Sequence, residues 1–429
     1  MLYFFTKQDA AARKAPPGGP GGGGSGVKTM GGGPVSWLSD SLRAFFRKGD
    51  LLLLSLCLLA SGYGLVLIYS ATRYLHSNRN LVVQCAAICL GVLVYIFLSS
   101  VDIELFTSRS WKLLLVFNMG FNLLVRTPLK VVSNTGNDSW IRIPGFPVNL
   151  QPGEIVKLSF VLVLAWQMAR LQEKGISRPS SVMQIAGHTL FIFALLSWAS
   201  GDFGMGLTYL LIFVIMAWAA GVKKRWFLLG LAVCVVGIAL IWPRISDMYF
   251  AQRITVVIDH ILGNPDTLYN QTQGIGWQQT RSILAIGSGG LFGQGWCRGI
   301  QTQSQFDTSL PARYTDEIFA VCGEEVGLVG CVVLLGLLAC IIMRCVWVAR
   351  RACSPQSAFI AMGYAGMLLA QVGVNVGMCL YVFPVVGLTL PFVSAGVSSI
   401  VTTYAAMGIV SGIKMRSLPS WLRDRNSFS

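Results

Sequence analysis

An aspartate at the edge of an apolar segment is the residue of this sequence best suited to chemistry. Acidic residues are scarce, 18 in 429, and Asp316 stands in the run LPARYTDE at 310–317, just before an apolar stretch. A carboxylate at a membrane boundary is costly and usually marks a site or an ion pair. Asp316 could act as a general base, or it could cap the helix that follows, because an acid at a helix start satisfies free amides and the helix dipole. Spacing alone leaves both interpretations open.

Three further acids and one lysine stand where chemistry is conceivable. Glu324 and Glu325 would point in different directions on one helix, so at most one shares a face with Asp316; each could instead make a buried structural hydrogen bond or salt bridge. Glu154 and Lys157 are three residues apart and would be neighbours on one helical face. The lysine could bind a phosphate, or the two side chains could simply neutralise each other.

Glycine and cysteine patterns exclude two kinds of site. The run IGSGGLFGQG at 286–295 lacks the GK[ST] ending of a nucleotide-binding P-loop and follows no predicted strand, so we expect its glycines to let backbones pack closely. The chain has no CxxC pair, and its three histidines (His76, His188 and His260) are far apart, which argues against a zinc site.

Composition places the chain in a membrane. It is 54% hydrophobic and 12% charged, where a soluble domain carries about a quarter charged residues. Apolar runs of the length needed to cross a hydrocarbon core of about 30 Å recur throughout. We predict an all-α polytopic membrane protein with ten spans, at roughly 51–70, 80–99, 110–126, 155–171, 186–200, 203–221, 226–243, 317–343, 356–382 and 386–412.

The positive charges predict the orientation of these spans. The net charge of +15 arises mainly from short loops and indicates no nucleic-acid surface. With ten spans, five basic clusters fall on one side, which predicts that both termini are cytoplasmic. The clusters lie at 43–48, 170–178, 223–225, 344–351 and 414–425.

Composition and the predicted spans divide the chain into three regions. Residues 1–48 are rich in Gly and Pro and are expected to be a disordered cytoplasmic tail, residues 49–415 to be the transmembrane domain, and residues 416–429 a second cytoplasmic tail. The segment 244–316, between the seventh and eighth spans, is long and has aromatic residues at intervals. We expect it to be a large, ordered extracytoplasmic loop folded back onto the helices.

Spaced motifs along most of the membrane part resemble the SEDS family (shape, elongation, division and sporulation), which includes RodA, FtsW and SpoVE. They include IGSGG at 286–290, TQSQ at 302–305, TD at 315–316, EEVGLVG at 324–330, QP at 151–152 with Glu154 and Lys157, and LPFVS at 390–394. The TQSQ run is similar to the RodA branch.

The resemblance implies an enzyme that polymerises lipid II into glycan strands at the outer face of the inner membrane, for cell-wall elongation and cell shape. It also implies a class B penicillin-binding protein as partner, for which we expect spans eight and nine to supply the docking face, and Asp316 as the catalytic residue. We expect seven residues to bind substrate: Trp140, Arg142, Glu154, Lys157, Arg281, Glu324 and Ser394. Of these, Lys157, Arg142 and Arg281 are candidates for the pyrophosphate, a role that a divalent cation (Mg or Mn) could share; no organic cofactor is expected.

Two departures from the family pattern bear on activity. Ala312 stands where the family usually has glutamate, and Ser139 where arginine commonly precedes Trp140, which could weaken substrate binding. Two other functions stay open: a flippase or transporter of the lipid-linked precursor, and a non-catalytic scaffold of a cell-wall complex. A transporter predicts internal repeats and broken helices at the midplane. The sequence has no clear repeat, and its polar residues gather at the outer boundary.

Overall fold

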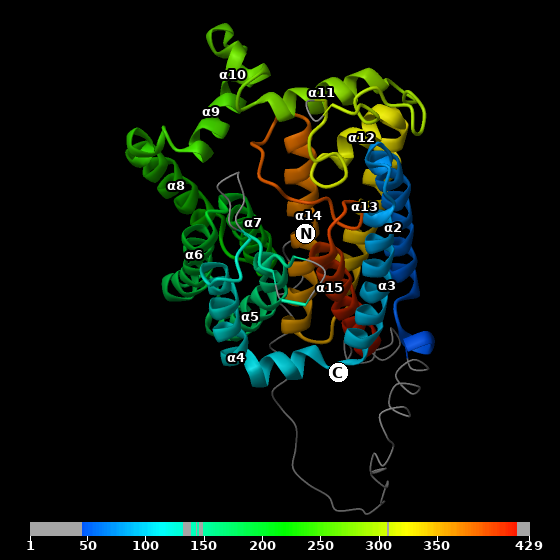
Figure 1. Cartoon of the computed structure of the whole chain (residues 1–429). Helices are drawn as coiled ribbons and strands as arrows, with labels where there is room; N and C mark the ends of the chain where they lie inside the picture. Colours follow the sequence, from blue (N-terminus) through cyan, green and yellow to red (C-terminus); the bar gives the residue numbers. More distant parts are fainter. Residues whose placement is uncertain (1–44, 132–138, 143, 146–148, 307–308, 418–429) are drawn as a thin grey trace, which may run out of the picture.

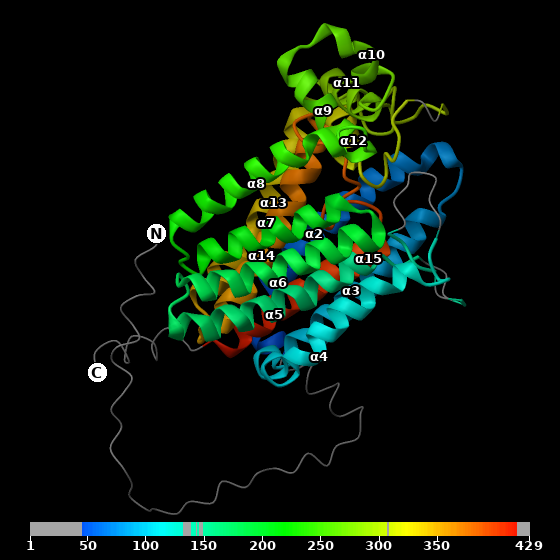
Figure 2. The ribbon, with the colours of Figure 1, turned by 90° about the vertical axis from the view of Figure 1, so that its left-hand side faces the viewer.

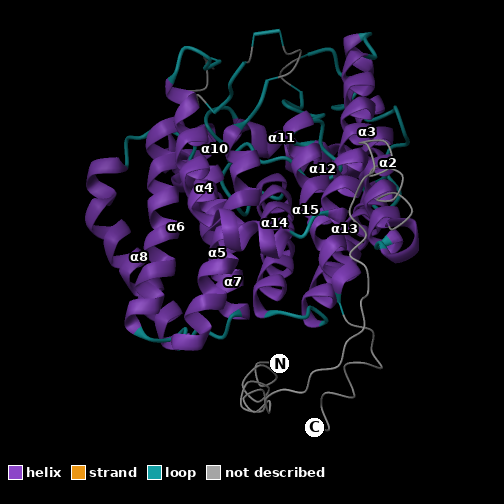
Figure 3. Ribbon diagram, turned by 90° about the horizontal axis from the view of Figure 1, so that it is seen from below, coloured by secondary structure: helices purple, strands orange, loops and turns teal. Residues whose placement is uncertain are grey.

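The computed structural model describes residues 45–131, 139–142, 144–145, 149–306 and 309–417 and is almost wholly helical (Figure 1). Its long helices are α2 (Leu51–Thr72), α3 (Arg79–Ser100), α4 (Ile103–Leu123), α5 (Pro152–Lys174), α6 (Pro179–Ser200), α7 (Phe203–Ala219), α8 (Lys224–Ile245), α13 (Gly327–Arg350), α14 (Pro355–Cys379) and α15 (Val397–Arg416). Shorter helices are α9 (Tyr249–Leu262), α10 (Leu268–Thr272), α11 (Trp277–Gly289) and α12 (Ile318–Glu325), with 3₁₀ turns η1 (Arg73–Leu75), η2 (Leu124–Arg126) and η3 (Pro265–Thr267). Within the described residues, extended pairing is limited to two isolated bridges, Lys130–Ile141 and Ile141–Leu150, and Figure 3 shows helices and loops only.

Seven helices in the described part of the chain are long and apolar enough to cross a membrane: α2 together with η1, α3, α6, α8, α13, α14 and α15. Three more long helices lie among them. α4 has Arg109 and Lys112 within its length rather than at its ends, α5 has five charged residues, and α7 is 17 residues long, shorter than a typical span of about 20. The all-helical membrane fold predicted from composition is therefore confirmed.

The boundaries of two predicted spans were wrong. The eighth, predicted as one helix over 317–343, is divided into α12 and α13, because Gly327 adopts a left-handed conformation with φ +77° that an α-helix cannot continue. The tenth was predicted from residue 386, but α15 begins at Val397. Residues 380–396 form a non-helical segment, in which Tyr381, Gly387 and Phe392 also have positive φ.

The predicted tail boundary at residue 48 lies within the fold. Residues 45–48 are helical, and the fully buried Phe45 packs edge-to-face on Tyr95 of α3, with ring centroids 5.9 Å apart. Phe45 supplies an apolar side chain that can be buried against α3, whereas the Gly/Pro-rich stretch of the sequence before it has few such side chains. The rest of the N-terminal tail predicted to be disordered, residues 1–44, lies outside the described residues, as do residues 418–429 of the predicted C-terminal tail.

Burial separates central from peripheral helices. Of the most apolar 18-residue stretch of each helix, 83% is buried in α15 and 78% in α14, whereas none is buried in α8. α15 packs on α3, and α14 packs on α13, α7 and α5. Figure 1 shows α8 at the edge of the bundle, and Figures 1 and 2 both show α9–α12 gathered at one end of it.

The opposite end of the bundle is joined by a buried ion pair. Asp50 caps the start of α2 and accepts two hydrogen bonds from the Arg344 guanidinium of α13, at 2.9 and 3.0 Å. The Tyr95 hydroxyl of α3 donates to the Asp50 carbonyl, and the Ser411 hydroxyl of α15 accepts from the Asp50 amide. Four helices are thereby fixed to one another at the end remote from α12.

Candidate active site

Asp316 ends a tight turn immediately before α12. Ala312, with φ +46°, directs this turn, and its carbonyl accepts hydrogen bonds from the amides of Thr315 and Glu317. The N-cap of α12 is Glu317, which makes no side-chain capping bond, and no described residue donates a hydrogen bond to the Asp316 carboxylate. The capping interpretation thus lacks support, and the role of Asp316 as a base stays a prediction.

The electrostatic surroundings of Asp316 favour its protonated form. Burial, followed by the nearby Asp202 carboxylate, raises the pKa of Asp316 to about 6. A carboxyl group with a pKa close to the operating pH is suited to proton transfer, because it is ionised yet still basic.

The non-helical segment 380–396 holds the backbone of the Asp316 turn. The Ser394 hydroxyl donates to the Thr315 carbonyl at 2.6 Å and accepts from the Leu390 amide at 2.8 Å. The Asn375 amide group of α14 donates both to the Asp316 carbonyl at 2.8 Å and to the Leu388 carbonyl at 2.7 Å. Ser394, expected at the substrate, is therefore engaged in backbone contacts.

Gln84 of α3 fastens this segment from its other side. Its side-chain amide donates to the Ser394 carbonyl at 3.1 Å, and its side-chain oxygen accepts from the Gly396 amide at 3.1 Å. Gln84 was not among the predicted site residues, although a glutamine inside the apolar run of the second span was a signal. A buried polar side chain in such a run needs a partner.

Asp202 forms a second acidic position near the turn. It caps α7 by accepting a hydrogen bond from the Met205 amide and accepts another from the Ser139 hydroxyl, both at 2.9 Å. Burial raises the pKa of Asp202 against these two hydrogen bonds, with smaller opposing effects from Glu154 and Lys157. Ser139, the departure noted in the sequence, thus satisfies a buried carboxylate.

Glu154 and Lys157 of α5 form a buried ion pair. Their Oε1 and Nζ atoms are 2.8 Å apart, and the two residues are 3% and 0% exposed. The predicted shared helical face is confirmed, and of the two open interpretations the structure shows mutual neutralisation. Breaking such a pair would leave an uncompensated buried charge, which is strongly destabilising.

Glu324 and Glu325 hold the loop that precedes the Asp316 turn. Glu324 accepts from the amides of Gln301 and Thr302 and from the Thr302 hydroxyl, at 2.6–2.8 Å. Glu325 accepts from Ser70 of α2 at 2.7 Å and from Gln303 at 3.0 Å. This geometry favours the structural interpretation of both acids over substrate contact by Glu324.

The glycine run serves close packing. A Cβ on Gly289 would lie 1.9 Å from the Gly323 carbonyl oxygen, and one on Gly293 would lie 2.2 Å from that of Glu325. These distances leave no room for a side chain, so the end of α11 and the loop after it lie directly on α12, in agreement with the packing predicted from sequence.

The remaining predicted residues lie apart from these contacts. Trp140 and Arg142 are exposed on the segment between α4 and α5, where the Arg142 guanidinium donates to Asn149 at 3.1 Å. Arg281 lies part-buried on α11. None of the three is hydrogen-bonded to Asp316.

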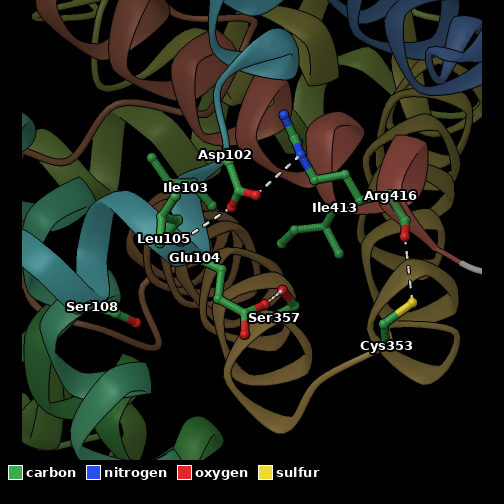
Figure 4. Close-up of a pocket in the computed structure, with 9 residues that line it drawn as sticks. All are labelled: Asp102, Ile103, Glu104, Leu105, Ser108, Cys353, Ser357, Ile413 and Arg416. Carbon is green, nitrogen blue, oxygen red and sulfur yellow. Dashed lines mark hydrogen bonds and ion pairs between the residues drawn. The ribbon is translucent and has the colours of Figure 1, made fainter. Parts of the chain in front are cut away.

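A cavity of about 350 Å³ lies at the far end of the bundle. Figure 4 shows its lining, drawn from the starts of α4 and α14 and the end of α15: Asp102, Ile103, Glu104, Leu105, Ser108, Cys353, Ser357, Ile413 and Arg416. Glu104 there accepts hydrogen bonds from Ser354 and Ser357, both at 2.6 Å. None of the predicted site residues lines this cavity, so its size does not identify it as the reaction site.

Comparison with known proteins identifies the class. Residues 50–418 match the family of cell cycle proteins that comprises FtsW, RodA and SpoVE, and the chain belongs to this family. This places it among the peptidoglycan glycosyltransferases of cell-wall synthesis.

Individual relatives cover most of the chain. It is 37% identical over 269 residues to the peptidoglycan glycosyltransferase MrdB of Escherichia coli K12, covering 62% of this chain and 68% of MrdB. It is 30% identical to the probable peptidoglycan glycosyltransferase FtsW of Trichlorobacter lovleyi, covering 88% and 98% of the two chains. Among solved structures, it is similar to a chain of a peptidoglycan synthase complex that coordinates polymerization and crosslinking (TM-score 0.68, 27% identity, 88% and 98% covered). It is also similar to the structure of Thermus thermophilus RodA, with a TM-score of 0.60 and 26% sequence identity, covering 87% of this chain and 98% of RodA.

The hydrogen bond from Ser394 to the Asp316 turn yields a test. Ser394→Ala leaves the part-buried Thr315 carbonyl without its donor, which costs about 1–3 kcal/mol. We expect a lower melting temperature and reduced glycan polymerisation, because the turn that carries Asp316 loses a fixed point. Ser55→Ala, at an exposed serine on α2 whose hydroxyl bonds within its own helix, is the control. A Ser394→Ala protein as stable and active as this control would show that the hydrogen bond is dispensable.

Proposed function

We propose that this protein polymerises lipid II, the undecaprenyl-pyrophosphate-linked disaccharide, into glycan strands, with Asp316 as general base. The observation that carries the proposal is the environment of the Asp316 carboxyl group. This group is part-buried, makes no helix-capping hydrogen bond, and has its pKa raised to about 6. Hydrogen bonds from Ser394 and Asn375 to backbone carbonyls hold the turn that carries it. Family membership supports the class of reaction.

The proposed chemistry is a displacement at the anomeric carbon. Asp316 accepts the proton of the attacking sugar hydroxyl, while the new C–O bond forms and the bond to the pyrophosphate breaks. An in-line displacement without a covalent intermediate inverts the α-linkage of the donor to the β-linkage of the glycan. Holding the two sugars in line supplies the proximity contribution.

Cations stabilise the departing pyrophosphate in this proposal. Arg142 is exposed and Arg281 is part-buried, whereas the Lys157 ammonium is buried and already paired with Glu154, so the arginines are the better candidates. A Mg or Mn ion bound together with the pyrophosphate would supply further positive charge. Loss of polymerisation on chelation, with recovery on adding back the ion, would support that role.

The proposed topology has ten spans, with α4, α5 and α7 crossing beside the seven most apolar helices, in the inner membrane. The basic clusters at the starts of α2 and α8 and the ends of α13 and α15 support cytoplasmic termini. The segment α9–α11 and Asp316 would then face outward.

This orientation can be checked by labelling intact spheroplasts. An impermeant maleimide should modify Tyr269→Cys, at a position 73% exposed on α10, and spare the native exposed Cys353 at the start of α14. Variants that retain one cysteine each make the comparison clean. Labelling of Cys353 from outside would reverse the proposed orientation.

Asp316→Asn tests the base assignment. Asparagine keeps the size of aspartate but is not basic, so we expect normal expression with a loss of roughly a hundredfold or more in polymerisation of fluorescent lipid II. In the wild type, the rate should rise with pH through about 6 as the carboxylate forms. Asp266→Asn, on the exposed turn η3, is the matched control. Substantial polymerisation by folded Asp316→Asn protein would end the assignment.

We further propose that a class B penicillin-binding protein docks through its single span on α13. The relative whose structure coordinates polymerization and crosslinking supports such a partner. The docking face was predicted on spans eight and nine, which correspond to α12–α13 and to α14. α14 is mostly buried, with Ile360 0% exposed, whereas Val332 and Val333 of α13 are 61% and 55% exposed. α13 therefore offers the better surface.

Photo-crosslinking distinguishes this face. A photoreactive residue at 332 or 333 should capture the transpeptidase in membranes, whereas one at 334, where Leu334 is fully buried, should not. Capture confined to positions on α3 or α4 would contradict the assignment to α13.

A further inference from the structure

Glu317, next to Asp316, is a buried acid for which the proposed reaction has no use. It is 0% exposed, and its Oε1 accepts a hydrogen bond at 3.0 Å from the Gln278 side chain of α11. Its amide donates to the Ala312 carbonyl at 3.1 Å. Glu317 thus connects α11 to the turn that positions Asp316.

The second carboxyl oxygen of Glu317 is incompletely satisfied. Oε2 is buried and has no hydrogen-bond partner of normal geometry among the described residues, and the same is true of the Ser282 hydroxyl on α11. An ionised carboxylate accepts at both oxygens and donates nothing, whereas a protonated one can itself donate. A buried charge whose one donor of normal geometry is Gln278, with Ser282 and Cys379 nearby in poorer geometry, is costly, so this environment suits the neutral acid.

The charged groups around Glu317 also favour its neutral form. The titratable groups that face Glu317 are Asp316 on the same turn and Cys379 of α14, and no described lysine or arginine forms an ion pair with it. Burial raises the pKa of Glu317 to about 7 against the lowering effects of Ser282, Gln278 and Cys379, and Asp316 adds a smaller rise.

We propose that Glu317 is a positioning residue that must carry its proton to keep α11 seated on the Asp316 turn, and that its ionisation sets an alkaline limit on the reaction. Ionisation places a second negative charge beside Asp316 and draws water toward an oxygen that lacks a donor of normal geometry. The turn then loses its fixed relation to α11. This proposal rests on the proposed function, because the limit is expressed through Asp316.

Polymerisation of fluorescent lipid II by the full-length protein between pH 5.5 and 9 tests this. In the wild type, the rate at pH 8.5 should be about tenfold or more below that at pH 6.5, since a group with pKa near 7 is then almost wholly ionised. In Glu317→Gln, which keeps size and neutrality, the ratio of the two rates should be close to one. Glu325→Gln, equally buried on α12, is the control and should keep the wild-type ratio. A Glu317→Gln profile that falls as the wild type does overturns the proposal.

Thermal unfolding against pH gives an independent measurement. Because the folded pKa lies above the ordinary value of 4.5, the folded state binds more protons than the unfolded state between about 4.5 and 7, so stability falls across that window. Glu317→Gln should therefore melt higher than the wild type above pH 7, with a difference that shrinks toward pH 4.5. A constant difference at every pH, or failure of Glu317→Gln to fold, counts against the proposal.

A second variant leaves Glu317 in place. Gln278→Met removes the donor to Oε1, which disfavours the ionised form and should move the alkaline limb to higher pH; an unmoved limb would contradict the proposed coupling. If Asp316→Asn is inactive while Glu317→Gln keeps the wild-type profile, only the role of Glu317 is rejected. If Asp316→Asn is active, the base assignment is rejected, and the unfolding curves still decide whether Glu317 is held neutral.

Discussion

Buried backbone groups must find hydrogen-bond partners within the protein, and this constraint governs the region around Asp316. Residues 380–396 are not helical, so their carbonyls and amides need donors and acceptors from elsewhere. Asn375, Ser394 and Gln84 supply them, and in doing so tie α14, α3 and the Asp316 turn together. The position of Asp316 is thus a by-product of satisfying irregular backbone, which explains how a turn without regular structure can hold a carboxyl group in place.

Local patterns were readable from the sequence, and long-range ones were not. The i,i+3 relation of Glu154 and Lys157 and the close packing of the glycine run follow from helix geometry and side-chain size alone. The breaks at Gly327 and before Val397 depend on what packs opposite, because glycine and short polar runs also occur within membrane helices. The backbone contacts of Ser394 and Gln84 span 79 and 310 residues, and no periodicity encodes such partners.

The acidic residues near the site differ in how many hydrogen-bond donors or cations their carboxylates have as partners. Glu154 has a lysine, Glu324 has donors at both of its oxygens, and Glu325 has several donors at Oε1. Asp316 and Glu317 have few, and burial raises the pKa of both. Carboxyl groups with perturbed pKa values gather at functional sites because proton transfer requires them there. The contrast between well-satisfied and poorly satisfied acids separates the structural carboxylates from the candidate chemical ones more sharply than sequence spacing does.

The isolation of α8 makes bilayer thickness a variable of the site. This helix of 22 residues is about 33 Å long. None of its residues is buried, and Trp226 and Phe227 at its start make its packing contacts with the rest of the fold, so little protein packing opposes a change in its tilt. Its end is followed directly by α9, whose Arg253 donates to the Val385 carbonyl in the segment that holds Asp316. Lipids of shorter or longer acyl chains would tilt α8 differently and pull on that hydrogen bond. The acyl-chain length of the lipid chosen for reconstitution therefore affects the geometry of the site, through the tilt of α8.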